Sequence, residues 1–459
     1  MTMRKRIGRG VACGLVMLFL LGAGFQFFSA RDLSRPGYIA LGILLTAATL
    51  WLTEAVPLFV TSLLILLLSI VWLAPEMRSA GMAVDDAAFL APFFSDIILL
   101  FLGGFVMSTA LRKLLLDEWL ARQIVARTGR SVPKLIAGVM MITAVLSMWL
   151  SNTATAAMML GLVLPIARSM PADDRYRKAL LLSIPFAANV GGLGTPIGSP
   201  PNAIAMQYMR QLEIDPSFGM WMLIGVPGVV GMLALTWVLL MFFYRGTAGV
   251  VLEDNGSLRI KRSPAMYLVV GTTLVTMMGW LTGGLHGFSS GTVALIPVLV
   301  FFGNGVLTRT DLRSLSWDVL LLMGGGLCLG VVMARSGLAD WLVAGLPIEG
   351  LNAYWVMVLF GGVACVMSCV MSNTATANLM MPIILGMSIE PLSPVLIGIA
   401  FACSMAMPLP VSTPPNAMAF SSGEITAGPM FKTGLCITIV GLVLTFSTGY
   451  WWWGIVGLY

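Results

Sequence analysis

Apolar segments long enough to cross a lipid bilayer recur along most of this chain. A membrane-spanning helix needs about 20 apolar residues. We predict about eleven spanning segments, at 10–29, 38–54, 56–74, 97–115, 179–208, 219–244, 264–283, 289–304, 316–336, 393–422 and 433–455. Helices satisfy their own backbone in lipid, and these segments lack the alternation of barrel strands. We therefore expect an all-α membrane protein.

The peptide Ser-Asn-Thr-Ala-Thr-Ala interrupts two apolar stretches, at 151–156 and 372–377. Ser, Asn and Thr are preferred residues at the start of a helix, and the Ala-Thr-Ala run begins one. The unpaired amides and the positive dipole end at such a start attract an anion without any Lys or Arg. Two such starts fit a ligand with two negative groups. The alternative is that these polar residues only hold helices together in lipid.

The lengths around the first copy predict a hairpin. Residues 135–150 would form a helix of about 24 Å and residues 154–166 one of about 20 Å. Each is too short for a hydrocarbon core of about 30 Å, and together they are too long for one crossing. We therefore predict re-entrant hairpins at 134–168 and 352–390, although a single tilted and kinked span is the alternative.

Proline-rich loops follow both hairpins, at 194–202 and 408–416. Proline removes amide donors and clashes with the preceding turn, so neither loop can be continuous helix. Unwound backbone at membrane depth exposes carbonyl oxygens, which coordinate Na⁺ in broken-helix transporters. The hydroxyls of Ser147 and Ser368, one turn before each tip, can complete the coordination. Bonds from these hydroxyls to their own helices are the alternative.

The chain is an internal duplication. Residues 96–104 match 318–326 at an offset of 222, the hairpin peptides match at 221, and 199–203 match 413–417 at 214. An odd number of predicted spans in each copy makes this an inverted repeat, in which binding sites lie between the halves. The predicted organisation is an N-terminal span at 1–37, a first repeat at 38–244 (hairpin 134–168, broken helix 179–208), a cytoplasmic linker at 245–263, and a second repeat at 264–459 (hairpin 352–390, broken helix 393–422).

Composition agrees with membrane embedding. The mean hydropathy is +0.94, and only 10% of residues are charged. With a cytoplasmic N-terminus, eleven spans put 21 of the 26 Lys and Arg residues on the cytoplasmic side, as the positive-inside rule requires. The net charge of +6 therefore reflects topology, and we expect no nucleic-acid partner.

The polar motifs exclude most other functions. They offer hydroxyls and amides but no acid–base pair, so we expect no enzyme activity. The six cysteines lie in apolar segments and the only histidine is His286, which favours packing roles over disulfides or a metal centre. A passive channel is a further alternative to a transporter.

The chain resembles the divalent anion/sodium symporter family, of the bacterial dicarboxylate/sulfate transporter type. The resemblance rests on Trp51-Leu-Thr-Glu54-Ala-Val-Pro57, Leu102-Gly103-Gly104-Phe105, both hairpin tips and both Pro-Pro-Asn loops. It implies a homodimer in the bacterial inner membrane, in which a transport domain slides against a scaffold domain in an elevator motion.

The resemblance also implies site residues. Substrate contacts would come from Ser151, Asn152, Thr153, Ser372, Asn373, Thr374, Ser199, Pro200, Thr413 and Pro414. Na⁺ would be the coupling ion at two or more sites, one at Ser147, Ser151, Asn152 and Gly198 and another at Ser368, Met371, Asn373 and Ser412, partly through backbone carbonyls. The expected function is sodium-coupled import of a small divalent anion, a C4-dicarboxylate such as succinate. A Na⁺-independent dicarboxylate exchanger and a sodium/sulfate or citrate symporter remain alternatives.

Overall fold

A computed structural model describes residues 3–25, 32–128, 131–214, 216–247, 262–346, 350–387 and 389–459. The regular elements within these ranges are all helical, which confirms the predicted all-α class. Eight helices in this part of the chain are long and apolar enough to cross a membrane. Seven of them coincide with predicted spans, and the eighth, Val132–Trp149, is the first arm of the first predicted hairpin. Most of the predicted linker at 245–263 lies outside the described residues.

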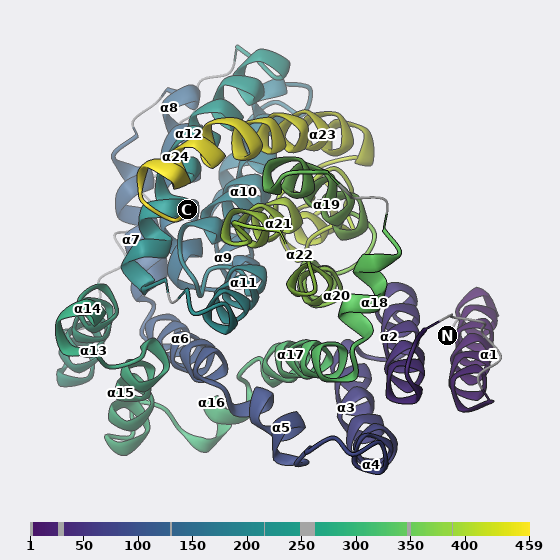
Figure 1. Ribbon diagram of the computed structural model, residues 1–459. Coiled ribbons are helices and arrows are strands. Elements are labelled where there is room, and N and C mark those ends of the chain that lie inside the picture. The colour runs from purple at the N-terminus through teal and green to yellow at the C-terminus, as the bar shows by residue number, and fades with distance from the viewer. Residues whose placement is uncertain are drawn as a thin grey trace.

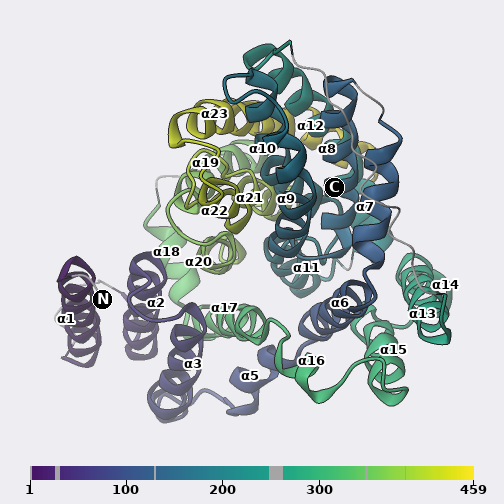
Figure 2. The same ribbon diagram turned by 180° about the vertical axis from the view of Figure 1, so that it is seen from behind.

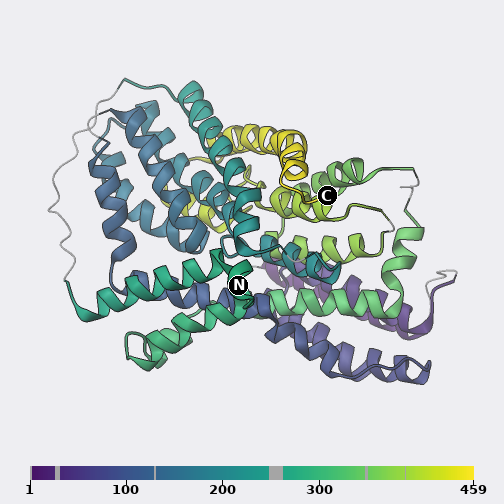
Figure 3. The same ribbon diagram turned by 60° about the vertical axis from the view of Figure 1, so that its left-hand side comes forward.

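The helices form an arc-shaped lower layer and an upper body (Figure 1). Both halves of the chain contribute to the lower layer, which Figure 3 shows from the side. Its elements are α1 (Met3–Phe25), α2 (Arg35–Thr53), α3 (Leu58–Leu68), the π-helix η1 (Ser69–Leu73), α4 (Ala74–Ser79), α5 (Ala87–Leu90), the 3₁₀ turn η2 (Ala91–Phe94), α6 (Asp96–Lys113), α13 (Pro264–Leu281), α14 (Gly283–His286), α15 (Ser290–Gly303), α16 (Arg309–Arg313) and α17 (Trp317–Ser336).

The upper body contains the hairpins and the broken helices of both halves (Figure 2). Its elements are α7 (Leu116–Ala126), α8 (Val132–Trp149), α9 (Asn152–Arg168), α10 (Arg175–Gly191), the 3₁₀ turn η3 (Gly192–Gly194), α11 (Pro200–Gln211), α12 (Phe218–Phe243), α19 (Ala353–Ser368), α20 (Asn373–Leu385), α21 (Ser393–Ser404), α22 (Pro414–Ser421), α23 (Ala427–Leu444), the π-helix η4 (Thr445–Gly449) and α24 (Tyr450–Ile455). The short helix α18 (Leu338–Ala344) connects α17 to this body.

Glycine backbones let the helices of the lower layer approach closely. Gly103 in α6 lies against Ala294 of α15, and Gly325 in α17 lies against Ser62 of α3. A Cβ atom at either glycine would overlap its neighbour. Small residues at such contacts are typical of membrane helix packing, because close approach maximises van der Waals contact.

The two hairpins contact the lower layer unequally. Asn378 of α20 is fully buried against Gly326 of α17, and its Nδ2 donates to the Leu322 carbonyl oxygen at 3.0 Å. α17 packs along α20, whereas α6 makes no comparably extensive contact with α9. The residue of α9 that corresponds to Asn378 is the exposed Ala157. Of the second helices of the two hairpins, α20 therefore packs along a helix of the lower layer, and α9 has no comparable partner there.

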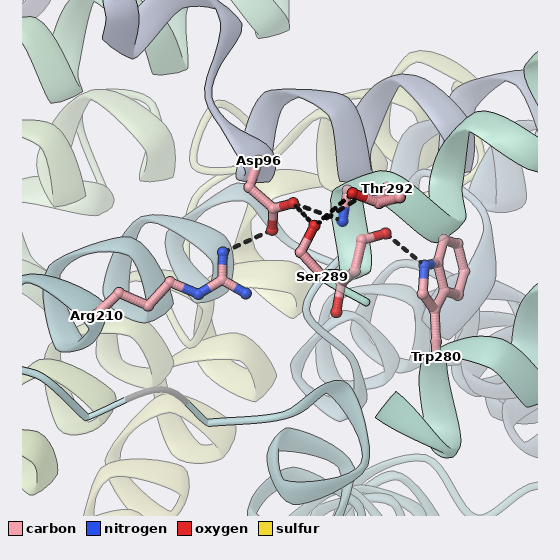
Figure 4. A network of polar contacts seen from close by, with 7 residues as sticks. Asp96, Arg210, Trp280, Ser289 and Thr292 are labelled. Carbon is pink, nitrogen blue, oxygen red and sulfur yellow. Dashed lines mark hydrogen bonds and ion pairs between the residues drawn. The ribbon is translucent and has the colours of Figure 1, made fainter. Parts of the chain in front are cut away.

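An ion pair also joins the layers (Figure 4). Arg210, in the last turn of α11, lies 2.7 Å from Asp96 at the start of α6. The other carboxylate oxygen of Asp96 accepts hydrogen bonds from the Ser289 hydroxyl and from the Gly291 amide, which lies 2.9 Å away. The ion pair thereby connects the upper body to both α6 and α15.

Candidate functional site

The first hairpin turns at Leu150 and Ser151. Both residues have extended backbone, which ends α8 and lets α9 pack back against it. The Ser151 side chain accepts a hydrogen bond from the Ala154 amide at 3.2 Å and caps α9. α8 begins at Val132, before the predicted start at residue 134, because Pro133 fits the first turn of a helix.

The second hairpin has the same tip. Ser372 has φ −65° and ψ 141°, against −66° and 141° at Ser151. Its side chain accepts from the Ala375 amide at 3.1 Å. Each serine therefore caps the second helix of its hairpin, and that helix provides no partner for its first amide groups.

Four oxygen-bearing groups meet below the first tip and form what we call the first oxygen cluster. One end of the Asn152 carboxamide lies 2.5 Å from Ser147 Oγ, 3.2 Å from the Ala188 carbonyl oxygen and 3.1 Å from that of Gly198. Ser147 is fully buried, and its hydroxyl also donates to the Ala188 carbonyl at 2.8 Å. In one orientation Asn152 adds a fourth oxygen, and in the other its NH₂ group donates to the three oxygens.

A second oxygen cluster has the same plan below the second tip. The hydroxyl of Ser368 donates to Asn373 Oδ1 at 2.7 Å and to the Cys403 carbonyl oxygen at 2.9 Å. Ser412 Oγ donates to the carbonyl oxygen of Cys369, the residue after Ser368, at 3.2 Å. The structure thus places the predicted Ser–Asn pair of each half against a backbone carbonyl.

Asparagine side chains fix the shape of both broken loops. Asn202 Nδ2 donates to the carbonyl oxygens of Gly192 and Thr195, at 2.8 Å each. Asn416 Nδ2 makes the equivalent bonds to Met407 at 2.8 Å and to Leu409 at 3.1 Å. Because these carbonyls lie outside the α-helices, the asparagines supply the donors that the interrupted backbone lacks.

The remaining predicted substrate residues differ in exposure. Thr153 and Pro414 are exposed, Pro200 is half-buried and Thr374 is buried. The exposed pair lies on α9 and α22, which flank a cavity of about 440 Å³. That cavity is lined by Ala157, Leu160, Gly161, Leu164, Ala417, Met418, Ser421 and Ser422.

Three other predicted residues lie deeper. The hydroxyls of Ser199 and Thr413, each 2% exposed, are engaged with Ser404 and Asn189. The Met371 side chain packs in an apolar cluster with residues of α2, α3 and α17, so only its backbone is suited to an ion. The roles of all three stay predictions.

Asn189 and Ser404 were not among the predicted site residues. Each ends an apolar stretch just before a broken loop, and an isolated polar residue at membrane depth is a signal of function. The carbonyls of Ala188 and Cys403 were not predicted either, because a backbone oxygen has no signature in the side-chain sequence.

The electrostatics of the site come from helix ends. α9, α11, α20 and α22 all begin at the hairpin tips or the broken loops, and α9 packs on α22 while α20 packs on α11. Their N-termini carry partial positive charge. Within the described residues no group of three or more His, Cys, Asp or Glu side chains gathers to hold a metal ion. Neutral oxygens are therefore the ligands that the two clusters offer.

A salt bridge fixes the far end of the first hairpin. Glu424, after α22, pairs with Arg168 at the end of α9 at 3.0 Å and with Arg177 in α10. The Arg168 hydrogen bond, with help from Arg177, holds the pKa of Glu424 below its usual value. This carboxylate is thus charged at neutral pH and joins the ends of α9, α10 and α22.

Comparisons with known proteins show the family of this chain. The model of the citrate transporter family matches residues 48–391. The sodium-dependent dicarboxylate transporters SdcS of Staphylococcus aureus strains USA300 and NCTC 8325 are each 31% identical over 496 residues, covering 98% of this chain and 92% of the relative. The Alcanivorax borkumensis YdaH transporter has a similar fold, with a TM-score of 0.56 at 14% identity, over 87% of this chain and 99% of that one.

The SdcS relatives match 98% of the chain, and the family model extends over both hairpin tips and the first broken loop. The relatives are transporters by name, and the apolar helices make this chain a multi-pass membrane protein. The chain belongs to the divalent anion/sodium symporter family.

Proposed function

We propose that this protein couples inward Na⁺ flow to the uptake of a small divalent anion, a C4-dicarboxylate such as succinate. The observation that carries the proposal is the pair of matching oxygen clusters, each beside a helix N-terminus. The SdcS relatives, named as sodium-dependent dicarboxylate transporters, support the choice of ion and substrate.

The first oxygen cluster fits Na⁺. With Asn152 Oδ1 directed at the cluster, it faces the carbonyl oxygens of Ala188 and Gly198, acceptor against acceptor, and a cation relieves their repulsion. Neutral hydroxyl, amide and carbonyl oxygens are the ligands that bind Na⁺ in broken-helix transporters. Ser151 completes the proposed set. We place a second ion at Ser368, Asn373, Ser412 and the Met371 backbone.

Na⁺ also prepares the anion site. An ion that fixes Asn152 Oδ1 on the cluster turns the Nδ2 donor of the same carboxamide away from it. Without the ion, the rotated amide donates to Ser147, Ala188 and Gly198 instead, and that donor is lost to the substrate. At the second tip, Asn373 Oδ1 likewise accepts from Ser368, which leaves its Nδ2 donor for the substrate. We propose that each hairpin tip binds one of the two carboxylates. Ion and substrate thereby raise each other's affinity, as linkage requires.

Transport requires access from both sides. The upper body would be the transport domain and the lower layer the scaffold of an elevator, in a homodimer of the bacterial inner membrane. The α9–α22 cavity lies along the part of α9 that follows the tip, at Ala157–Leu164, while α17 packs along α20. α9 ends at Arg168, which the predicted topology places in the cytoplasm, so we propose that this cavity opens to the cytoplasm and that the conformation is inward-facing.

The test is uptake of radiolabelled anions into proteoliposomes, with and without an inward Na⁺ gradient. We expect succinate uptake only with the gradient. Citrate is the second candidate, because the matching family model is that of a citrate transporter. Preferential uptake of citrate would make it the substrate in place of succinate. Uptake that needs internal dicarboxylate but no Na⁺ would contradict symport and indicate an exchanger.

A further inference from the structure

Two sets of hydrogen bonds cross between the halves of the protein in a reciprocal pattern, and both lie beside the oxygen clusters. Ala188 and Cys403 occupy equivalent places, since each carbonyl accepts from the serine one turn before its hairpin tip. The residue after each, Asn189 or Ser404, directs its side chain at the broken loop of the other half.

The first crossing starts from the first loop. Gly198 contributes its carbonyl oxygen to the first oxygen cluster, and the next residue, Ser199, shares a hydrogen bond of 2.9 Å with Ser404. Ser404 follows Cys403, whose carbonyl belongs to the second oxygen cluster. The two clusters are therefore connected by a short path. It runs along the chain from Gly198 to Ser199, through the hydrogen bond to Ser404, and along the chain to Cys403.

The second crossing runs in the opposite sense. Asn189 Nδ2 donates to Thr413 Oγ1 at 3.0 Å and to Asn416 Oδ1 at 3.3 Å. Thr413 follows Ser412, one of the proposed ligands of the second ion, and Asn189 follows Ala188 of the first oxygen cluster. Asn416 in turn holds the second loop in shape.

The crossings lie in a dry environment. Asn189, Ser199 and Thr413 are each 2% exposed and Ser404 is 1% exposed. A buried polar group that loses its partner is costly, so these pairs resist independent movement of the two loops. Such pairs would pass a displacement of Gly198 or Ala188 on to the other half.

We propose that Asn189 and Ser404 are positioning residues that couple the two ion sites, so that an ion at one cluster raises the affinity of the other. This inference rests on the proposed function, because it requires that Na⁺ occupies both clusters. It assigns the hydroxyls of Ser199 and Thr413 to the contact between the halves.

The experiment measures succinate uptake into proteoliposomes at rising Na⁺ concentration, for the wild type, Asn189→Leu and Ser404→Ala. The wild type should show a Hill coefficient above 1. Each variant should lower that coefficient toward 1 and raise the half-saturating Na⁺ concentration about fivefold, the lower end of typical coupling between sites. Uptake at saturating Na⁺ should change less.

Two controls separate coupling from a general structural role. Ser404→Thr restores a hydroxyl and should restore the cooperativity. Ser183→Ala removes an equally buried hydroxyl of α10 that bonds only locally, to the Leu180 carbonyl at 2.7 Å, and should leave the Hill coefficient unchanged.

The inference is overturned if the wild type has a Hill coefficient of 1, or if Asn189→Leu and Ser404→Ala keep the wild-type coefficient and half-saturation. Wild-type succinate uptake without any Na⁺ dependence is a different result, because it overturns the proposed function itself.

Discussion

At the scale of single residues, the Asn152 carboxamide stands between an oxygen cluster and the first turn of α9. Its two ends differ chemically, since the oxygen only accepts and the nitrogen only donates. An ion and a carboxylate therefore need opposite ends of the same group. In the proposed function, this division lets one uncharged side chain serve both ligands.

Asn152→Asp tests that division, because aspartate keeps the oxygens and loses the donor. We expect Na⁺ binding to persist and succinate affinity to fall at least about tenfold, since a lost hydrogen bond to a charged group costs about 1.5–3 kcal/mol and like charges repel. Calorimetric titration of the purified variant with each ligand measures both effects. Asn304→Asp, at an exposed helix end whose side chain bonds Val300, is the control. Wild-type succinate affinity in Asn152→Asp would contradict the role of the donor.

The sequence predicted part of the site at this scale. Ser147, Asn152, Ser368 and Asn373 were found because the motif occurs twice and its side chains are polar in an apolar context. Asn189 is also polar in an apolar context, but it does not belong to a repeated motif, and it was therefore not predicted. Its contact with the second broken loop depends on how the two halves pack together, which no local sequence pattern predicts.

At the scale of elements, the contact between α17 and α20 depends on Gly326, which has no side chain. The carboxamide of Asn378 fills the place that a Cβ at Gly326 would occupy. Gly326→Ala should force the helices apart and lower stability by about 1–3 kcal/mol, as overpacking does. The measurement is the thermal unfolding temperature in detergent, together with succinate uptake, and both should fall.

Gly362→Ala is the matched control, because a Cβ there meets nothing within 4 Å and alanine favours helix. Equal unfolding temperatures for the two variants would contradict tight packing of α17 on α20.

Element lengths and prolines were enough to predict where the chain turns and breaks. The broken loops lie between α10 and α11 and between α21 and α22, where proline excludes helix. Element ends were less predictable, as the earlier start of α8 shows. Lys134 was taken as the boundary because of its charge, but Pro133 starts a helix without needing its own amide.

At the scale of the whole molecule, the layers are joined at one end by the ion pair of Arg210 and Asp96. If the upper body slides along the lower layer, this pair must break in each cycle. Arg210→Gln should shift the population away from the present conformation about fivefold, since a partly exposed pair contributes up to about 1 kcal/mol.

The shift can be measured by thiol labelling of Ala157→Cys, whose side chain would line the α9–α22 cavity. Labelling should slow in the Arg210→Gln background. Arg78→Gln breaks a pair that lies wholly within the lower layer, with Asp86 at 2.9 Å, and should change nothing. Unaltered labelling in Arg210→Gln would indicate that this pair does not move.

The duplication predicted matching halves but not their unequal contacts. The difference between Ala157 and Asn378 was visible in the sequence, yet its meaning depends on α17 lying against one hairpin only. The opposite insertion of the two halves stays a prediction, supported by the distribution of Lys and Arg.

The measurement that tests the central claim most directly is reciprocal binding to the purified protein. Succinate affinity would be determined at a series of Na⁺ concentrations, and Na⁺ affinity with and without succinate. We predict that each ligand tightens the other by the same factor, as linkage demands. Succinate binding of equal strength in Na⁺ and in choline would contradict the account.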